Sequence, residues 1–277
     1  MLLTHRGPEG FSRSPLTAMI DVAPPQSAMG RLGAGYWAES HRPLASLAFV
    51  VPLLAVYEVG VLVQGAAAAR NGADVWLRTF LDLVGFGQYF LLPLLTVSIL
   101  LGWHYTTRQP WRLSRGTLGG MAVESGVLSL FLWLILQLQG ALLHVVAGQI
   151  GPAAEPAAAG LSVSGNLGSL VGYLGAGVYE ELLFRLMLLP VVAWGVQRLG
   201  VAGVPSLVVA AVSTSLVFAA AHHVGQHGEP LDWFIFLFRF LAGLFFCVLF
   251  VKRGFGIAAG THAGYDILVG IFLARAA

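Results

Sequence analysis

The sequence predicts an all-α membrane protein, a polytopic bundle of about seven transmembrane helices behind an irregular N-terminal tail. Of its 277 residues, 57% are apolar and only 10% are charged, whereas about 25% of the residues in a typical soluble domain are charged. The mean hydropathy is +0.79. The apolar residues form long continuous runs, and about 20 such residues cross the hydrocarbon core as a helix. Because these runs do not alternate with polar residues, they predict helices rather than barrel strands.

The expected elements follow in chain order. Residues 1–43 contain five prolines and no long apolar run, which predicts a flexible tail. Residues 44–160 are expected to hold the N-terminal membrane helices, with apolar runs at 44–67, 85–104 and 118–147 and an amphipathic stretch at 74–83 that fits the membrane interface. Residues 161–277 are expected to form a second group of membrane helices, with runs at 167–195, 203–222, 231–251 and 255–274.

The distribution of Lys and Arg predicts an orientation. These residues are concentrated in the tail and in the loops after the second, fourth and sixth runs, and positive loops stay in the cytosol. We therefore expect an integral protein of a bacterial plasma membrane, with its N-terminus in the cytosol and membrane lipid around it. The net charge of +2 gives no reason to expect nucleic acid as a partner.

Three charged residues stand in the middle of the run at 167–195, in the sequence GVYEELLFRLMLLP. Charges at this depth are expensive and indicate a functional site. Glu181 and Arg185 are four residues apart on one helix face, which predicts an ion pair. Glu180 points about 100° away from Glu181, so it stays available as a general base. The alternative is one buried salt-bridge cluster of all three residues.

Two further pairs share this four-residue spacing. Phe218 and His222 close the run at 203–222, and His262 and Asp266 lie early in the run at 255–274. A carboxylate one turn from a histidine orients the ring, or both groups point at one reacting oxygen. Arg239 lies among phenylalanines in the run at 231–251 and needs a carboxylate partner. The candidate partners are Glu180, Glu181 and Asp266.

In order, these motifs are EExxxR, FxxxH and HxxxD, and together they resemble the CPBP family of intramembrane proteases, which includes the CAAX prenyl endopeptidases and the Abi bacteriocin-processing relatives. The resemblance covers roughly residues 160–275. It implies a membrane endopeptidase in which Glu180 and His222 activate water, while His262 and Asp266 stabilise the oxyanion. Glu181, Arg185, Phe218 and Arg239 are then supporting residues. Family members often carry Asn where this chain has Asp266, and an ionised carboxylate cannot donate to an oxyanion.

The expected partner is therefore a membrane-associated peptide or protein substrate. A cofactor is not specified by the sequence. Glu180, His222 and His262 are a donor set that can hold Zn²⁺, but there is no HExxH motif and the same residues serve a metal-free mechanism. Two other functions also remain open. One is a non-catalytic scaffold or immunity protein with a structural polar cluster, and the other is a proton-coupled transporter.

Overall fold

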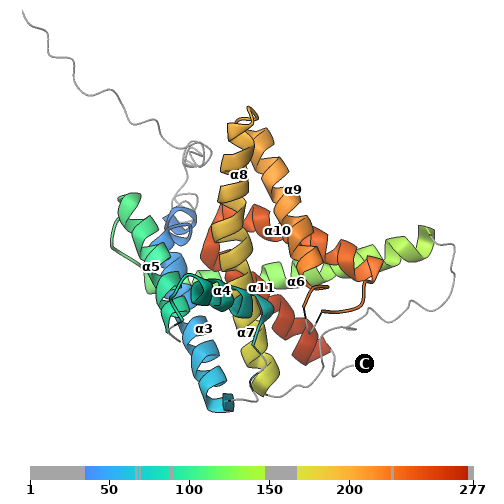
Figure 1. Cartoon of the computed structure of the whole chain (residues 1–277), viewed down its shortest axis with the longest axis horizontal. Helices are drawn as coiled ribbons and strands as arrows, with labels where there is room; N and C mark the ends of the chain where they lie inside the picture. The colour runs from blue at the N-terminus through green and yellow to red at the C-terminus, as the bar shows by residue number, and fades with distance from the viewer. Residues whose placement is uncertain are drawn as a thin grey trace, which may run out of the picture.

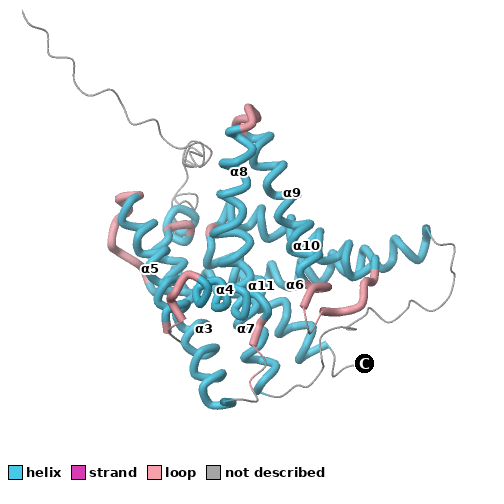
Figure 2. The backbone as a smooth tube through the Cα atoms, viewed as in Figure 1, coloured by secondary structure: helices cyan, strands magenta, loops and turns pink. Residues whose placement is uncertain are grey.

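The computed structural model describes residues 35–65, 68, 70–87, 90–146, 167–225 and 228–273, and within these ranges the chain forms helices and no strands (Figures 1 and 2). The predicted all-α fold is confirmed. The elements are α3 (Pro43–Gln64), α4 (Gly72–Leu83), α5 (Leu91–Thr106), α6 (Arg115–Val146), α7 (Leu167–Glu181), the π-helical segment η2 (Leu182–Leu188), α8 (Leu189–Arg198), α9 (Val204–Ala221), α10 (Trp233–Arg253), α11 (Phe255–Ile267) and the π-helical segment η3 (Leu268–Leu273).

Four of the described helices, α3, α6, α9 and α10, are long and apolar enough to cross a membrane. Each of the other apolar runs forms a shorter helix or helical segments joined end to end: α5 has 16 residues, and α7, η2 and α8 follow one another without a gap. The apolar helices support an integral membrane protein. The predicted count of about seven spans is not confirmed.

The predicted N-terminal tail is partly structured. Residues 35–40 are helical and precede α3 directly. The guanidinium of Arg253, at the end of α10, lies 3.5 Å from the centre of the Trp37 ring and forms an ion pair of 2.6 Å with Glu124 of α6. The end of the tail is thus packed against two helices, while the rest of the predicted tail, residues 1–34, lies outside the described residues.

Helix α11 lies at the centre of the bundle and packs against α3, α6, α7 and α10. Small residues make this possible, since a Cβ atom on Gly260 would lie 2.7 Å from the hydroxyl of Ser125 in α6. On the other side, a Cβ atom on Gly177 of α7 would lie 2.7 Å from the carbonyl oxygen of Ala259. Glycine at these positions lets the helix backbones approach closely, as is common in membrane bundles.

The predicted amphipathic helix is α4, and its apolar face points outward. Asp74 is fully buried against the protein. Apolar side chains on the same helix are exposed, namely those of Val75, Trp76, Phe80 and Leu83. Asp74 is buried on the inner face together with Ala73 and Leu77. Apolar side chains on the outer face suit a helix that lies between the protein and lipid.

Candidate active site

The two adjacent glutamates end α7, and the next seven residues are π-helical. The helix then continues as α8. π-Helical turns within α-helices occur frequently at functional sites. Here Glu180 and Glu181 are the last two residues of α7, and Arg185 lies in the π-helical segment that follows. All three side chains are buried.

Glu181 and Arg185 form the predicted ion pair, with 3.0 Å between Oε1 of Glu181 and Nη1 of Arg185. Both side chains are almost completely buried. The guanidinium of Arg185 lies 4.3 Å from the centre of the Phe218 ring, and its Nη2 donates to the carbonyl oxygen of Gly243 at 3.3 Å. The positive charge of Arg185 therefore neutralises Glu181 inside an aromatic pocket.

Glu180 has different partners. Its Oε1 accepts a hydrogen bond of 2.8 Å from the side-chain amide of Asn71. Its Oε2 is buried without a hydrogen-bond partner among the described residues. This oxygen lies 3.8 Å from Nε2 of His222 and 3.8 Å from Nε2 of His262. The gap suits a bridging water, because it exceeds the length of a direct hydrogen bond.

His222 follows the last residue of α9 and caps that helix. Its Nδ1 lies 2.8 Å from the carbonyl oxygen of Phe218. A carbonyl oxygen can only accept, so Nδ1 carries the proton and Nε2 of the neutral ring is left as an acceptor facing Glu180. The ring of Phe218 packs edge-on against His222, with 4.9 Å between the ring centres. The FxxxH motif thus holds the imidazole through both its backbone and its ring.

His262 is oriented by Glu181. Its Nδ1 donates to Oε1 of Glu181 at 2.8 Å, and Phe246 stacks on the ring with an interplanar angle of 12°. Asp266 approaches the other nitrogen, with 3.7 Å between its Oδ2 and Nε2 of His262. Glu181, the carboxylate that Arg185 neutralises, therefore fixes a proton on Nδ1 of His262. Asp266 and Glu180 both lie near the other ring nitrogen, Nε2.

The expected partners of Arg239 were wrong. Its Nη2 forms an ion pair of 2.8 Å with Glu229, and not with Glu180, Glu181 or Asp266. The chain after α9 folds back, so that the backbone N–H of Glu229 donates to the carbonyl oxygen of His222 at 3.0 Å. This places the Glu229 carboxylate beside α10. Glu229 belongs to a short polar loop outside the apolar runs, which is why the search for buried acids missed it.

A second residue that the sequence did not indicate is Asn71. It lies in a polar turn, 109 positions before the glutamate that it contacts. The turn itself was recognisable, because Asn71 precedes the amphipathic stretch as an N-cap and its Oδ1 accepts from the N–H of Ala73. Nothing in that local signal indicates a contact with Glu180.

The positions of the two histidines along their apolar runs suggest different depths in the membrane. Counted along straight parallel spans, His222 lies near one end of its helix and His262 near the opposite membrane face. The helices are not parallel, because Figure 1 shows α6 and α10 crossing the direction of α7 and α8. In this arrangement Glu180 at the end of α7, His222 at the end of α9 and His262 in α11 converge, with 3.8 Å between Oε2 of Glu180 and Nε2 of each histidine.

Within the described part of the chain, no group of three His, Cys, Asp or Glu side chains is arranged to hold a metal ion. The donor set that the sequence allowed for Zn²⁺ was Glu180, His222 and His262. In their place around Oε2 of Glu180, at 3.8 Å from each histidine nitrogen, these side chains leave room for a bridging water.

The sequence was compared with known protein families, curated proteins and solved structures. Neither a curated protein nor a solved structure matches the sequence. A protein family does match, over a segment in the C-terminal part of the chain that contains Glu180, His222 and His262. Residues 163–268 match the family described as Type II CAAX prenyl endopeptidase Rce1-like, and the resemblance to the CPBP family of intramembrane proteases is thereby confirmed.

Proposed function

We propose that this protein is an intramembrane endopeptidase that hydrolyses a peptide bond of a membrane-associated substrate with a water activated by Glu180 and His222. The family match supports protease activity. The observation that carries the mechanism is the buried Oε2 of Glu180, which has no hydrogen-bond partner in the described chain and faces Nε2 of two histidines at 3.8 Å.

A water molecule in this gap donates one hydrogen bond to Oε2 of Glu180 and the other to Nε2 of His222. Both groups are acceptors, since Nδ1 of His222 holds that ring's proton against Phe218. The water oxygen then directs a lone pair toward the carbonyl carbon of the substrate. As the carbon–oxygen bond forms, Glu180 accepts a proton from the water, which is general base catalysis.

His262 and Asp266 face the developing oxyanion. His262 is close to the carboxylates of Glu181, at 2.8 Å, and of Glu180, at 3.8 Å. These negative charges favour the imidazolium form of the ring, whose Nε2–H donates to the oxyanion. Asp266, at 3.7 Å from the same ring, acts on the oxyanion as a protonated carboxyl group that donates a hydrogen bond. The proton held by Glu180 passes to the leaving amine as the carbon–nitrogen bond breaks, which yields a carboxylic acid and an amine.

The substrate class follows from the family and from the setting of the site. A peptide that ends in a prenylated cysteine followed by three residues is the substrate that the name of the matched family indicates. Helices that are apolar enough to cross the membrane surround the site, so a lipidated peptide anchored in the bilayer reaches it by lateral diffusion. We propose this class for the present chain.

The test is cleavage of an internally quenched prenylated peptide by the purified protein in liposomes. Glu180→Gln keeps the shape of the side chain and its acceptor for Asn71 but removes the base, and His222→Ala removes the second acceptor. Each change is expected to lower kcat by about 100-fold or more, the range of general acid–base catalysis. The same peptide without its prenyl group shows whether the lipid contributes to recognition.

Thermal unfolding separates catalysis from a structural role. Glu180→Gln is expected to unfold near the wild-type temperature, whereas Arg185→Leu leaves Glu181 buried without its counter-charge and lowers stability by about 3 kcal/mol or more. Cleavage at the wild-type rate by purified Glu180→Gln would rule out the mechanism. It would favour a polar cluster that is only structural.

A further inference from the structure

The site contains one contact from outside the family-matched segment. Asn71 is the N-cap of α4, and its side chain serves two partners at once. Its Oδ1 accepts from the N–H of Ala73 at 2.9 Å, and its Nδ2 donates to Oε1 of Glu180 at 2.8 Å. Residues 163–268 account for the other close partners of Glu180, so this amide comes from a part of the chain on which the family match is silent.

We propose that Asn71 is a positioning residue for Glu180, which the proposed function makes the general base. A carboxylate has two equivalent oxygens and rotates about its terminal bond. The amide of Asn71 occupies Oε1 and thereby directs Oε2 toward His222 and His262. The inference rests on the proposed function and adds to it a residue that selects which oxygen meets the water.

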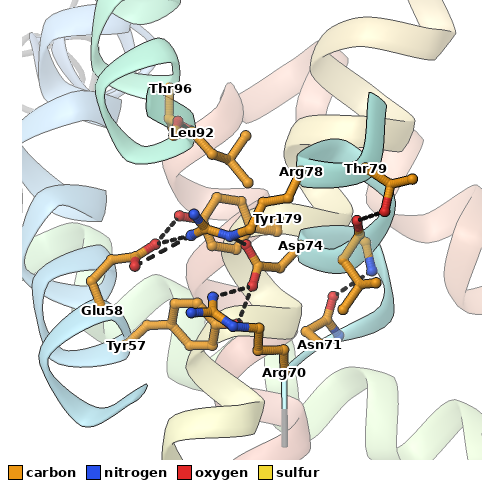
Figure 3. Close-up of polar contacts among 12 residues, drawn as sticks. Tyr57, Glu58, Arg70, Asn71, Asp74, Arg78, Thr79, Leu92, Thr96 and Tyr179 are labelled. Carbon is orange, nitrogen blue, oxygen red and sulfur yellow. Dashed lines mark hydrogen bonds and ion pairs between the residues drawn. The ribbon is translucent and has the colours of Figure 1, made fainter. Parts of the chain in front are cut away.

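A positioning residue must itself be held in place, and Figure 3 shows how this is done. Asp74 lies one turn into α4 and is fully buried. It accepts a hydrogen bond of 2.9 Å from the hydroxyl of Tyr57 in α3 and forms an ion pair of 2.6 Å with Arg78. The hydrogen bond from Tyr57 ties the start of α4 to α3, and the ion pair with Arg78 braces the first two turns of α4 itself. Asn71, at the N-cap of this helix, is held with them.

The contacts of Asp74 and Arg78 continue to α7, next to the proposed general base Glu180. Arg78 pairs with Glu58 of α3 at 3.0 Å, and Glu58 accepts a short hydrogen bond from the hydroxyl of Tyr179. Tyr179 is the residue immediately before Glu180. Two consecutive residues of α7 are thus connected to α4, one through Glu58 and Arg78 and the other through Asn71. Buried charges that are balanced in this way specify one arrangement of helices.

Two substitutions separate positioning from helix capping. Ser and Asp both cap helices as well as Asn does, so Asn71→Ser and Asn71→Asp keep the acceptor for Ala73. Asn71→Ser is too short to replace the 2.8 Å contact with Glu180. Asn71→Asp places a carboxylate there, which favours the protonated form of Glu180 by like-charge repulsion. Thr79→Ala is the matched control, because the Thr79 hydroxyl lies on the exposed side of α4 and donates to the carbonyl oxygen of Val75 in the same helix.

The experiment measures kcat, KM and the pH–rate profile of the full-length protein in liposomes with the quenched prenylated peptide. Asn71→Ser is expected to lower kcat by about 10- to 100-fold, as losses of residues that orient a catalytic group do, with KM within about 3-fold of the wild-type value. Asn71→Asp is expected to shift the acidic limb of the profile to higher pH. Thr79→Ala is expected to match the wild type in all three quantities.

The outcomes distinguish this inference from the proposed function. Wild-type kcat and an unshifted profile in both Asn71 variants would overturn the positioning role, even while Glu180→Gln is inactive. A fall in kcat for Asn71→Ser together with an unshifted profile for Asn71→Asp would also overturn it, because a structural role alone predicts that pattern. Absence of cleavage by the wild type would overturn the proposed function, and this inference with it.

Discussion

At the scale of single residues, the site separates two neighbouring glutamates by their partners. Glu181 is neutralised by Arg185 and orients His262. Glu180 has one oxygen bonded to Asn71, and its other oxygen has no hydrogen-bond partner among the described residues. The spacing of these residues was enough to predict the ion pair of Glu181 and Arg185, because positions i and i+4 lie together on any helix. The partners from α4 depend on tertiary packing and had no local signal.

Asp266 stands where the resemblance to the CPBP proteases would lead us to expect Asn. Its Oδ2 lies 3.7 Å from Nε2 of His262, and Glu181 already orients that ring. Asp266→Asn is therefore expected to keep kcat within about 10-fold of the wild type, because an amide donates to an oxyanion without being protonated first. It is also expected to extend cleavage to higher pH, where the carboxyl group of Asp266 loses its donor proton.

Asp266→Ala supplies the control for this prediction. It removes every donor at position 266, and loss of one oxyanion donor costs about 100- to 1,000-fold in kcat. The measurement is a pH–rate profile of the three proteins with one peptide. If Asp266→Asn were as inactive as Asp266→Ala, the negative charge of Asp266 would be what His262 requires, and a donor role would be wrong.

At the scale of helices, the apolar runs predicted most elements closely. The amphipathic stretch at 74–83 is α4, at Gly72–Leu83, and the run at 203–222 is α9, at Val204–Ala221. The π-helical segment η2 could not be predicted, because its residues have the same apolar composition as the α-helices on either side. The ion pair of Arg239 with Glu229 was also missed, because Glu229 lies in a loop and the apolar runs do not predict how a loop folds.

The close approach of α7 and α11 brings Glu180 and His262 together, and Gly177 permits it. A Cβ atom at this position would lie 2.6 Å from the Cβ of Ala263 and 2.7 Å from its backbone nitrogen. Gly177→Ala therefore forces the two helices apart. It is expected to lower stability by about 1–3 kcal/mol, as overpacking does. It is also expected to lower cleavage, because the side chains of Glu180 and His262, which the proposed mechanism needs together, separate.

Gly172→Ala on the same helix is the matched control. A Cβ atom there meets no atom within 4 Å, so the change is expected to raise helix stability by about 0.5–1 kcal/mol. Thermal unfolding in detergent, followed by the peptide assay, compares the two variants. Equal unfolding temperatures would show that α7 and α11 tolerate a methyl group between them, contrary to the packing described.

At the scale of the whole molecule, the candidate catalytic residues and the residues that support them come from both halves of the chain. The three motifs lie within residues 163–268, whereas α3 and α4 contribute Glu58, Asp74 and Asn71. The C-terminal segment therefore does not account for the site alone. The composition predicted a membrane protein without indicating this division, because hydropathy measures lipid exposure and carries no information on which helices meet.

The orientation of the molecule in the membrane is the prediction that belongs to this scale. With seven spans and a cytosolic N-terminus, the loops that contain Gln109 and Leu199 and the last turn of α10, which contains Lys252, face the cytosol. The loop that contains Leu231 faces the other side. The single cysteine, Cys247, is buried, so Cys247→Ala gives a background without cysteine. Cysteine introduced at each exposed position then reports its side through a membrane-impermeant maleimide in intact cells.

The expected labelling in intact cells is strong at Leu231→Cys and absent at Gln109→Cys, Leu199→Cys and Lys252→Cys until the membrane is permeabilised. Leu199 and Leu231 flank α9, with exposed fractions of 85% and 56%, so both thiols are reachable from their own side. Labelling of both in intact cells would mean that α9 does not cross the bilayer, and the predicted topology would be wrong. Labelling of Leu199→Cys alone would invert it and place the loop after His222 in the cytosol.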